Sequence, residues 1–154
     1  MSRFRFALAV ALCAAFPAIA AAADPFDGTW KLNTAKSKYD PGPAPDKATV
    51  TIHTDGANLT VKTESSFEGK PFATSYKVTL DGTPAPLQGS PVADMISVKK
   101  IDDHTRETKT TKAGSPVSES RVTVSADGQT ITVTGSGLNP KGIKTTFTAV
   151  YDKQ

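Results

Sequence analysis

The alternation of apolar and polar residues constrains this chain more than any other feature. The longest stripe places a core-type or threonine side chain at every second position: Phe72, Thr74, Tyr76, Val78 and Leu80. A period of two sends alternate side chains to opposite faces of a strand, so one face of the sheet is dry and the other is wet. Shorter stripes of the same kind recur from residue 49 to residue 151, and no helix-length apolar period interrupts them. The pattern predicts an all-β domain.

Turn dipeptides divide these stripes into strands. Asp55-Gly56, Asp81-Gly82 and Asp127-Gly128 are hairpin signals, because glycine tolerates the positive φ that tight hairpin turns need. Together with other Gly, Pro and Asn clusters they delimit about ten strands. The expected strands are 27–33, 47–54, 57–66, 70–80, 83–88, 93–101, 104–112, 115–126, 129–137 and 142–152.

Short connections after residue 47 predict that sequential strands pair as an antiparallel up-and-down meander of about 8–10 strands. Such a meander closes into a small barrel because closure removes exposed edges. An open two-sheet sandwich is the alternative. Two Pro-rich segments, 39–45 and 84–91, interrupt the pattern, since proline cannot donate to a ladder. We expect a loop at the first and a short edge strand with a corner at the second.

The alternation also predicts which side chains face the interior, because a slip of one residue would reverse a whole strand. The residues expected to point inward are Val50, Ile52, Leu59, Val61, Phe72, Tyr76, Val78, Ile96, Val98, Val122, Val124, Ile131, Val133, Phe147 and Tyr151.

The first residues have the pattern of a secretory signal peptide. Arg3 and Arg5 give a basic start, residues 6–19 are almost entirely apolar, and a run of alanines ends at Ala23. The apolar core is shorter than the about 20 residues that a membrane span needs, although a retained anchor is the alternative. We therefore expect a signal peptide over 1–23 and a β-barrel domain over 24–154. We expect the protein to be exported, to the periplasm or outside the cell, with no stable membrane anchor.

Composition excludes several functions. The formal net charge of +3 falls when the leader is removed, and the remaining basic residues are scattered, which argues against a nucleic-acid partner. The only cysteine, Cys13, lies in the leader, and His53 and His104 lack ligand spacing, so no metal and no cofactor is predicted. No catalytic residue is predicted either, because no nucleophile elbow occurs. Asp102 and Asp103 are read as solvated turn acids.

The sole tryptophan carries a resemblance. Gly28-Thr-Trp30-Lys-Leu-Asn33, the Asp127-Gly128 hairpin and the terminal Val150-Tyr151-Asp-Lys resemble exported bacterial lipocalin-like proteins of undefined function, within the calycin-type superfamily of lipocalins and fatty-acid-binding proteins. The resemblance implies that Trp30 plugs the closed end of the barrel, and that Gly28, Trp30 and Tyr151 are structural. The chain departs from the superfamily in ending on a strand and in lacking both an Arg on that strand and the Arg-x-Tyr carboxylate clamp.

The leading interpretation is an exported, non-enzymatic binding protein that holds a small, mostly apolar molecule in the barrel. The alternative is a structural or protein-interaction module with a filled interior, and an enzyme on this scaffold is a third. The candidate ligand-binding residues are Phe72, Tyr76, Ile96, Val98, Arg106, Thr108 and Phe147.

Arg106 lies in a strand, 104–112, that has no apolar residue. Arg106 shares one face with Thr108 and Thr110, and the opposite face carries an acid and a lysine and suits water better. Arg106 is therefore expected to point inward. Either its guanidinium reaches water at the rim, or it anchors a ligand carboxylate at the mouth beside Thr108 and Tyr76.

Overall fold

The computed structural model describes residues 23–154, so all but the last residue of the expected signal peptide lies outside the described residues. Within that range the chain forms strands and turns, and no helix is long and apolar enough to cross a membrane. The elements are β1 (Gly28–Leu32), β2 (Lys38–Asp40), β3 (Lys47–Asp55), β4 (Asn58–Phe67), β5 (Lys70–Thr79), β6 (Ala85–Pro86), β7 (Met95–Asp102), β8 (Thr105–Lys112), β9 (Ser115–Val124), β10 (Thr130–Leu138) and β11 (Lys144–Lys153).

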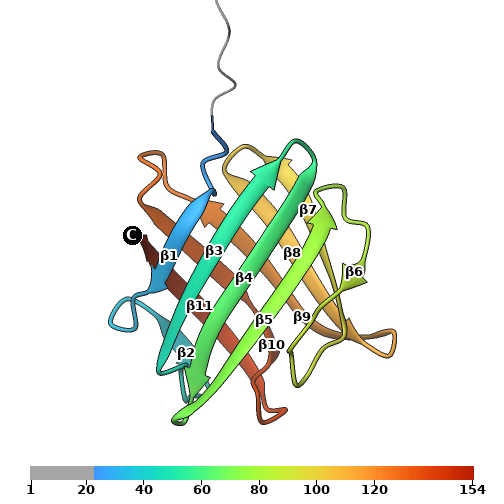
Figure 1. The fold of residues 1–154 in the computed structure, drawn as a ribbon. Coiled ribbons are helices and arrows are strands. Elements are labelled where there is room, and N and C mark those ends of the chain that lie inside the picture. Colours follow the sequence, from blue (N-terminus) through green and yellow to red (C-terminus); the bar gives the residue numbers. More distant parts are fainter. Residues whose placement is uncertain (1–22) are drawn as a thin grey trace, which may run out of the picture.

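All strands belong to one antiparallel sheet that curls into a nearly closed barrel (Figure 1). The order is β5-β4-β3-β1-β11-β10-β9-β8-β7-β6, with β2 attached to β11. Each hairpin joins sequential neighbours, and β1 links the two halves by pairing with both β3 and β11. The predicted barrel is confirmed, and the sandwich does not form.

One seam of the barrel lacks a continuous ladder. The sheet ends at β5 and β6, and the two edges meet only through isolated bonds, such as Lys100 N to the Leu80 carbonyl at 2.9 Å and the pair Ser75–Gln88. The prolines of the segment between β5 and β7 leave too few donors for a full strand there. Apolar side chains close the seam where the backbone ladder is missing: Val78 of β5 and Ile96 of β7 belong to one buried cluster.

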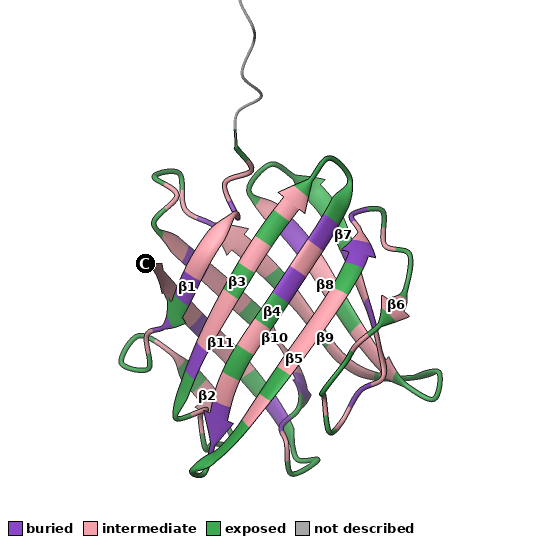
Figure 2. Cartoon of the chain, in the orientation of Figure 1, coloured by how far each residue is buried: buried purple, intermediate pink, exposed green. Residues whose placement is uncertain are grey.

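All ten predicted strands are present, with ends within two residues of those expected, and one short strand was missed. Residues 38–40 form β2, which runs into the Pro-rich loop and pairs with β11 at Tyr39 and Phe147. The strand expected at 83–88 shrinks to Ala85–Pro86 at the sheet edge, because proline ends the pairing there. None of the side chains predicted to face inward is exposed, and buried and half-buried positions alternate with exposed ones along the strands (Figure 2).

The two ends of the barrel differ. At the end where β1 starts, Phe26, Trp30, Val124 and Ile131 form a buried plug, and Trp30 has no exposed surface. The opposite end carries the β4–β5 and β10–β11 hairpins and the Pro-rich loop, and we call it the mouth.

Candidate functional site

An inner cavity of about 200 Å³ lies beyond the tryptophan plug. Alternation along the strands places its lining on the inner face of the barrel. The lining residues are Trp30, Val50, Ile52, Val61, Thr63, Tyr76, Thr108, Ser120, Val122, Ile131, Val133 and Tyr151. The cavity is therefore a mostly apolar chamber with a few polar positions, as small-molecule sites generally are.

Every polar side chain of this inner cavity carries a hydroxyl and no charge. Burial raises the pKa of Tyr76 to about 12, and the nearby positive charge of Arg106 offsets only part of this shift. Burial also raises the pKa of Tyr151, with a further contribution from Tyr39. Both phenols therefore stay neutral at ordinary pH and can donate or accept a hydrogen bond.

A second cavity, of about 240 Å³, lies at the mouth. Its walls include Phe67, Phe72 and Phe147, and Tyr39 stacks on Phe147 with ring centroids 6.0 Å apart. The Pro-rich loop contributes Pro43 to the same wall. The rings make this chamber apolar as well, and no residue that lines it is charged.

Small residues separate the two cavities on the wall formed by β9 and β10. Gly135 and Gly137 face inward, and a Cβ at Gly137 would lie 2.4 Å from the Cβ of Ser118. Ser118 also shares a hydrogen bond of 2.7 Å with Thr110 on β8. Because this wall carries hydroxyls and bare backbone, no bulky side chain from it stands between the chambers.

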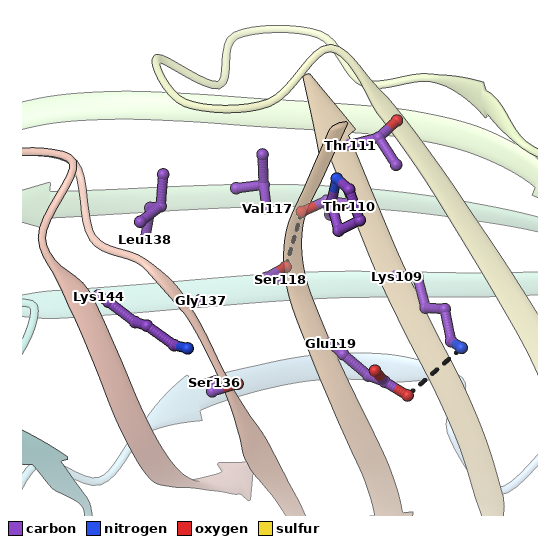
Figure 3. A pocket seen from close by; sticks show the side chains of 11 residues that line it. Lys109, Thr110, Thr111, Val117, Ser118, Glu119, Ser136, Gly137, Leu138 and Lys144 are labelled. Carbon is purple, nitrogen blue, oxygen red and sulfur yellow. Dashed lines mark hydrogen bonds and ion pairs between the residues drawn. The ribbon is translucent and has the colours of Figure 1, made fainter. Parts of the chain in front are cut away.

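A third, more polar hollow of about 450 Å³ opens beside the same wall (Figure 3). Lys109 and Glu119 form an ion pair of 3.4 Å along its edge, and Lys144 also contributes to the lining. Both members of the pair are largely exposed. Charged, water-exposed walls do not suit a lipophilic molecule, so we place the candidate site in the inner cavity and the mouth.

The buried end of Arg106 is already partnered. Its Nη2 donates to both carboxylate oxygens of Asp24 at 2.9 Å and to Thr54 Oγ1 at 3.2 Å. The guanidinium carbon lies 4.1 Å from the centre of the Phe26 ring. Burial lowers the pKa of Arg106, and the Asp24 carboxylate opposes that shift.

The structure confirms that Arg106 points inward but places its guanidinium neither at a rim nor at the mouth. It points inward as predicted, but it is only 4% exposed, so it does not reach water at a rim. It also lies at the plugged end beside Phe26 and not at the mouth. Anchoring of a ligand by Arg106 stays a prediction, in which a ligand would have to compete with Asp24.

The other predicted ligand-binding residues fall into three places. Tyr76 and Thr108 line the inner cavity, and Phe72 and Phe147 line the mouth. Ile96 and Val98 lie instead in the cluster that packs the seam and line neither chamber.

The residues expected to be structural lie at the plug and beside it. Trp30 Nε1 donates to the Phe26 carbonyl at 2.9 Å, and Lys153 Nζ, on the last strand, lies 5.1 Å from the centre of the Trp30 ring. A lysine thus occupies the place where the sequence lacked a stacking arginine. Gly28 has φ of 134°, which favours glycine, and Tyr151 lines the inner cavity.

Asp24 and Asn139 were missed from the sequence. Asp24 precedes the first strand, and nothing local links it to a residue 82 positions away. Asn139 sits in a turn cluster that we read only as a connection. The inward-facing residues Val50, Ile131 and Val133 were predicted to point into the barrel, and they line the inner cavity; alternation gives their face but not whether that face borders a cavity.

Comparisons with known proteins bear on the fold. No family model and no curated protein matches the sequence. Among solved structures, the chain is similar to a fatty acid binding protein of Schistosoma mansoni in complex with arachidonic acid, with a TM-score of 0.54 and 18% sequence identity. The alignment covers 84% of this chain and 96% of that chain. The likeness is one of fold.

Proposed function

We propose that this protein is an exported, non-enzymatic binding protein that holds one small lipophilic molecule inside the barrel. The observation that carries the proposal is the inner cavity, whose walls are apolar apart from a few neutral hydroxyls. The basic, apolar and small-residue order of residues 1–23 supports export. The fatty acid binding protein of similar fold, which holds arachidonic acid, supports a lipid-like occupant.

A structural or protein-interaction module is the second candidate. The volume of the inner cavity favours it, because about 200 Å³ is smaller than the roughly 300–1,000 Å³ of typical drug-sized sites. In that case the barrel is a scaffold, and its outer face carries the function.

Native mass spectrometry of the protein purified from its own compartment tests the proposal. We expect the native mass to include a bound small molecule that is lost on denaturation. The mass of the denatured chain should equal that of residues 24–154. A native mass equal to that of the processed chain, together with no binding of lipophilic probes, would favour the module. A denatured mass that includes residues 1–23 would overturn export through a cleaved leader.

A variant that fills the inner cavity tests whether the ligand binds there. Val133 faces the inner cavity from β10, and its neighbour Thr134 is exposed on the outer face of the same strand. Val133→Phe is expected to fill part of the cavity and to weaken binding of a fluorescent lipid probe, whereas Thr134→Phe is the matched control. Equal loss in both variants would place the probe on the surface.

A further inference from the structure

The mouth end of the barrel exposes apolar side chains at the tip of one hairpin. Among residues 23–154 the exposed large apolar residues are Ile101, Leu138 and Ile143, at 43%, 39% and 44%. Leu138 and Ile143 flank the turn between β10 and β11, which projects at the same end as the β4–β5 hairpin (Figure 1). Ile101 lies near the plugged end, where β7 finishes. Two aliphatic side chains in water at one tip favour contact with an apolar phase.

Hydrogen bonds hold this tip in one conformation. The Oδ1 of Asn139 accepts from Lys141 N at 2.9 Å and from Ile143 N at 3.1 Å, and Asn139 N donates to the Ile143 carbonyl at 2.9 Å. The Lys141 ammonium also forms an ion pair with Glu68, which ties the tip to the β4–β5 hairpin. The exposure of Leu138 and Ile143 is therefore built into the folded barrel, and little ordering is needed when they bind a partner.

Charged side chains are distributed unevenly between the two ends of the barrel. Aspartates gather at the plugged end, in or beside its turns: Asp24, Asp27, Asp55, Asp81, Asp102, Asp103 and Asp127. Arg106, Lys99, Lys100 and Lys153 offset only part of this charge. The connections at the mouth are flanked by Lys47, Lys70, Lys112, Lys141 and Lys144, against Asp40, Asp46, Glu68 and Asp94. An anionic surface therefore repels the plugged end and attracts the mouth, which orients the barrel as it approaches.

We propose that the mouth end docks reversibly on the surface of an anionic lipid bilayer, with the β10–β11 tip at the level of the headgroups. Leu138 and Ile143 enter the apolar boundary, and Lys144 lies against anionic headgroups, the combination by which interfacial segments bind membranes. A second copy of the chain fits this end less well, because it would bring like charges together. The docking goes beyond the proposed function, since it uses the outside of the barrel and needs no occupant inside.

Sedimentation with lipid vesicles tests the docking. The protein used is one whose mass matches residues 24–154, so that an uncleaved leader cannot bind the vesicles in its place. Vesicles of phosphatidylcholine mixed with phosphatidylglycerol should bind the protein at least about tenfold more tightly than vesicles of phosphatidylcholine alone. Added salt should release the protein, because it screens exposed charges.

Two results would count against the docking. No binding to the mixed vesicles at low salt would overturn it and leave ligand binding inside the barrel untouched. Equal affinity for both kinds of vesicle would overturn the choice of an anionic surface.

Matched substitutions assign the contact to the hairpin tip. Ile143→Ser and Ile101→Ser remove the same side chain, with nearly the same exposed fraction, from opposite ends of the barrel. Ile143→Ser should weaken binding to the mixed vesicles at least about fivefold, whereas Ile101→Ser should leave it unchanged. Lys144→Glu should weaken binding as well, and Lys62→Glu, the same charge change at an exposed position within β4, should do so much less. Equal losses within either pair would overturn the role of the tip.

A fluorescent label distinguishes contact with lipid from self-association. Ile143→Cys can be labelled at one position, because the only cysteine of the sequence, Cys13, precedes residue 24. An environment-sensitive dye at this position should shift to shorter emission wavelengths when mixed vesicles are added, and the same dye at Ile101→Cys should not respond. A shift that follows protein concentration without vesicles, and no shift with them, would assign the tip to a second copy and overturn the membrane docking.

Discussion

Trp30 is expected to be the largest single contributor to the stability of the plug. An aromatic side chain buries 150–250 Å², which at about 25 cal/mol per Å² corresponds to roughly 4–6 kcal/mol before compaction of the unfolded chain is considered. Because Trp30 has no exposed surface, nearly all of this hydrophobic free energy is realised in the folded protein. Trp30→Ala should therefore lower the free energy of unfolding by about 3–5 kcal/mol.

A second substitution separates volume from hydrogen bonding. Trp30→Phe keeps a ring in the plug and removes the N–H that donates to the Phe26 carbonyl at 2.9 Å. Leaving that buried carbonyl unpaired should cost about 1–2 kcal/mol. Because Trp30→Phe retains most of the packing, it also remains measurable if Trp30→Ala does not fold.

Urea unfolding followed by circular dichroism measures both variants, since the chain has only one tryptophan and fluorescence is lost with it. Leu138→Ala is the control, because this side chain is 39% exposed and should change stability by less than about 0.5 kcal/mol. In the wild type, Trp30 should emit at the short wavelengths typical of a buried indole. A loss of less than about 1 kcal/mol in Trp30→Ala, or emission typical of water, would refute the plug.

Two further predictions concern the walls of the cavities. Burial raises the folded-state pKa of Tyr76 from 10.0 to about 12, so the stability that the neutral phenol contributes is present below pH 10 and is lost as the pH rises toward 12. Between pH 10 and pH 12 the free energy of unfolding should fall by about 2 kcal/mol more in the wild type than in Tyr76→Phe. Equal pH dependence of the two proteins would contradict this. Gly135→Ala should lower the free energy of unfolding by about 1–3 kcal/mol, measured by thermal or urea unfolding, because the new Cβ would lie 2.2 Å from the Glu119 carbonyl oxygen. Gly42→Ala is the control: its Cβ would meet nothing closer than 3.9 Å, so its stability should hardly change.

The architecture could be predicted from the sequence because its signals are local. Hairpins such as Asp55-Gly56 fix where strands reverse, and alternation fixes which face is buried. The same reasoning placed Arg106 on the inner face of a strand without apolar residues. It worked because the side-chain period of a strand is independent of which strand lies opposite.

The site was harder to predict because it depends on residues far apart in the chain. Asp24 and Arg106 lie 82 positions apart and are brought together only by the closed barrel, and no local sequence pattern around either residue predicts the pair. Periodicity also cannot tell whether an inward side chain packs against a partner or faces an empty space. Val98 and Tyr76 follow the same alternation, yet the first fills the seam and the second borders the cavity.

The seam between β5 and β7 makes this barrel a rolled sheet and not a continuous ring. Everywhere else the circumference is fixed by hydrogen-bonded ladders, whereas here it is held by a few isolated bonds and by apolar side chains. Side-chain packing is non-directional, so the two edges can shift relative to each other without breaking a ladder. A ligand of the kind proposed above would therefore meet one line of the barrel wall that can yield to its girth without loss of a ladder.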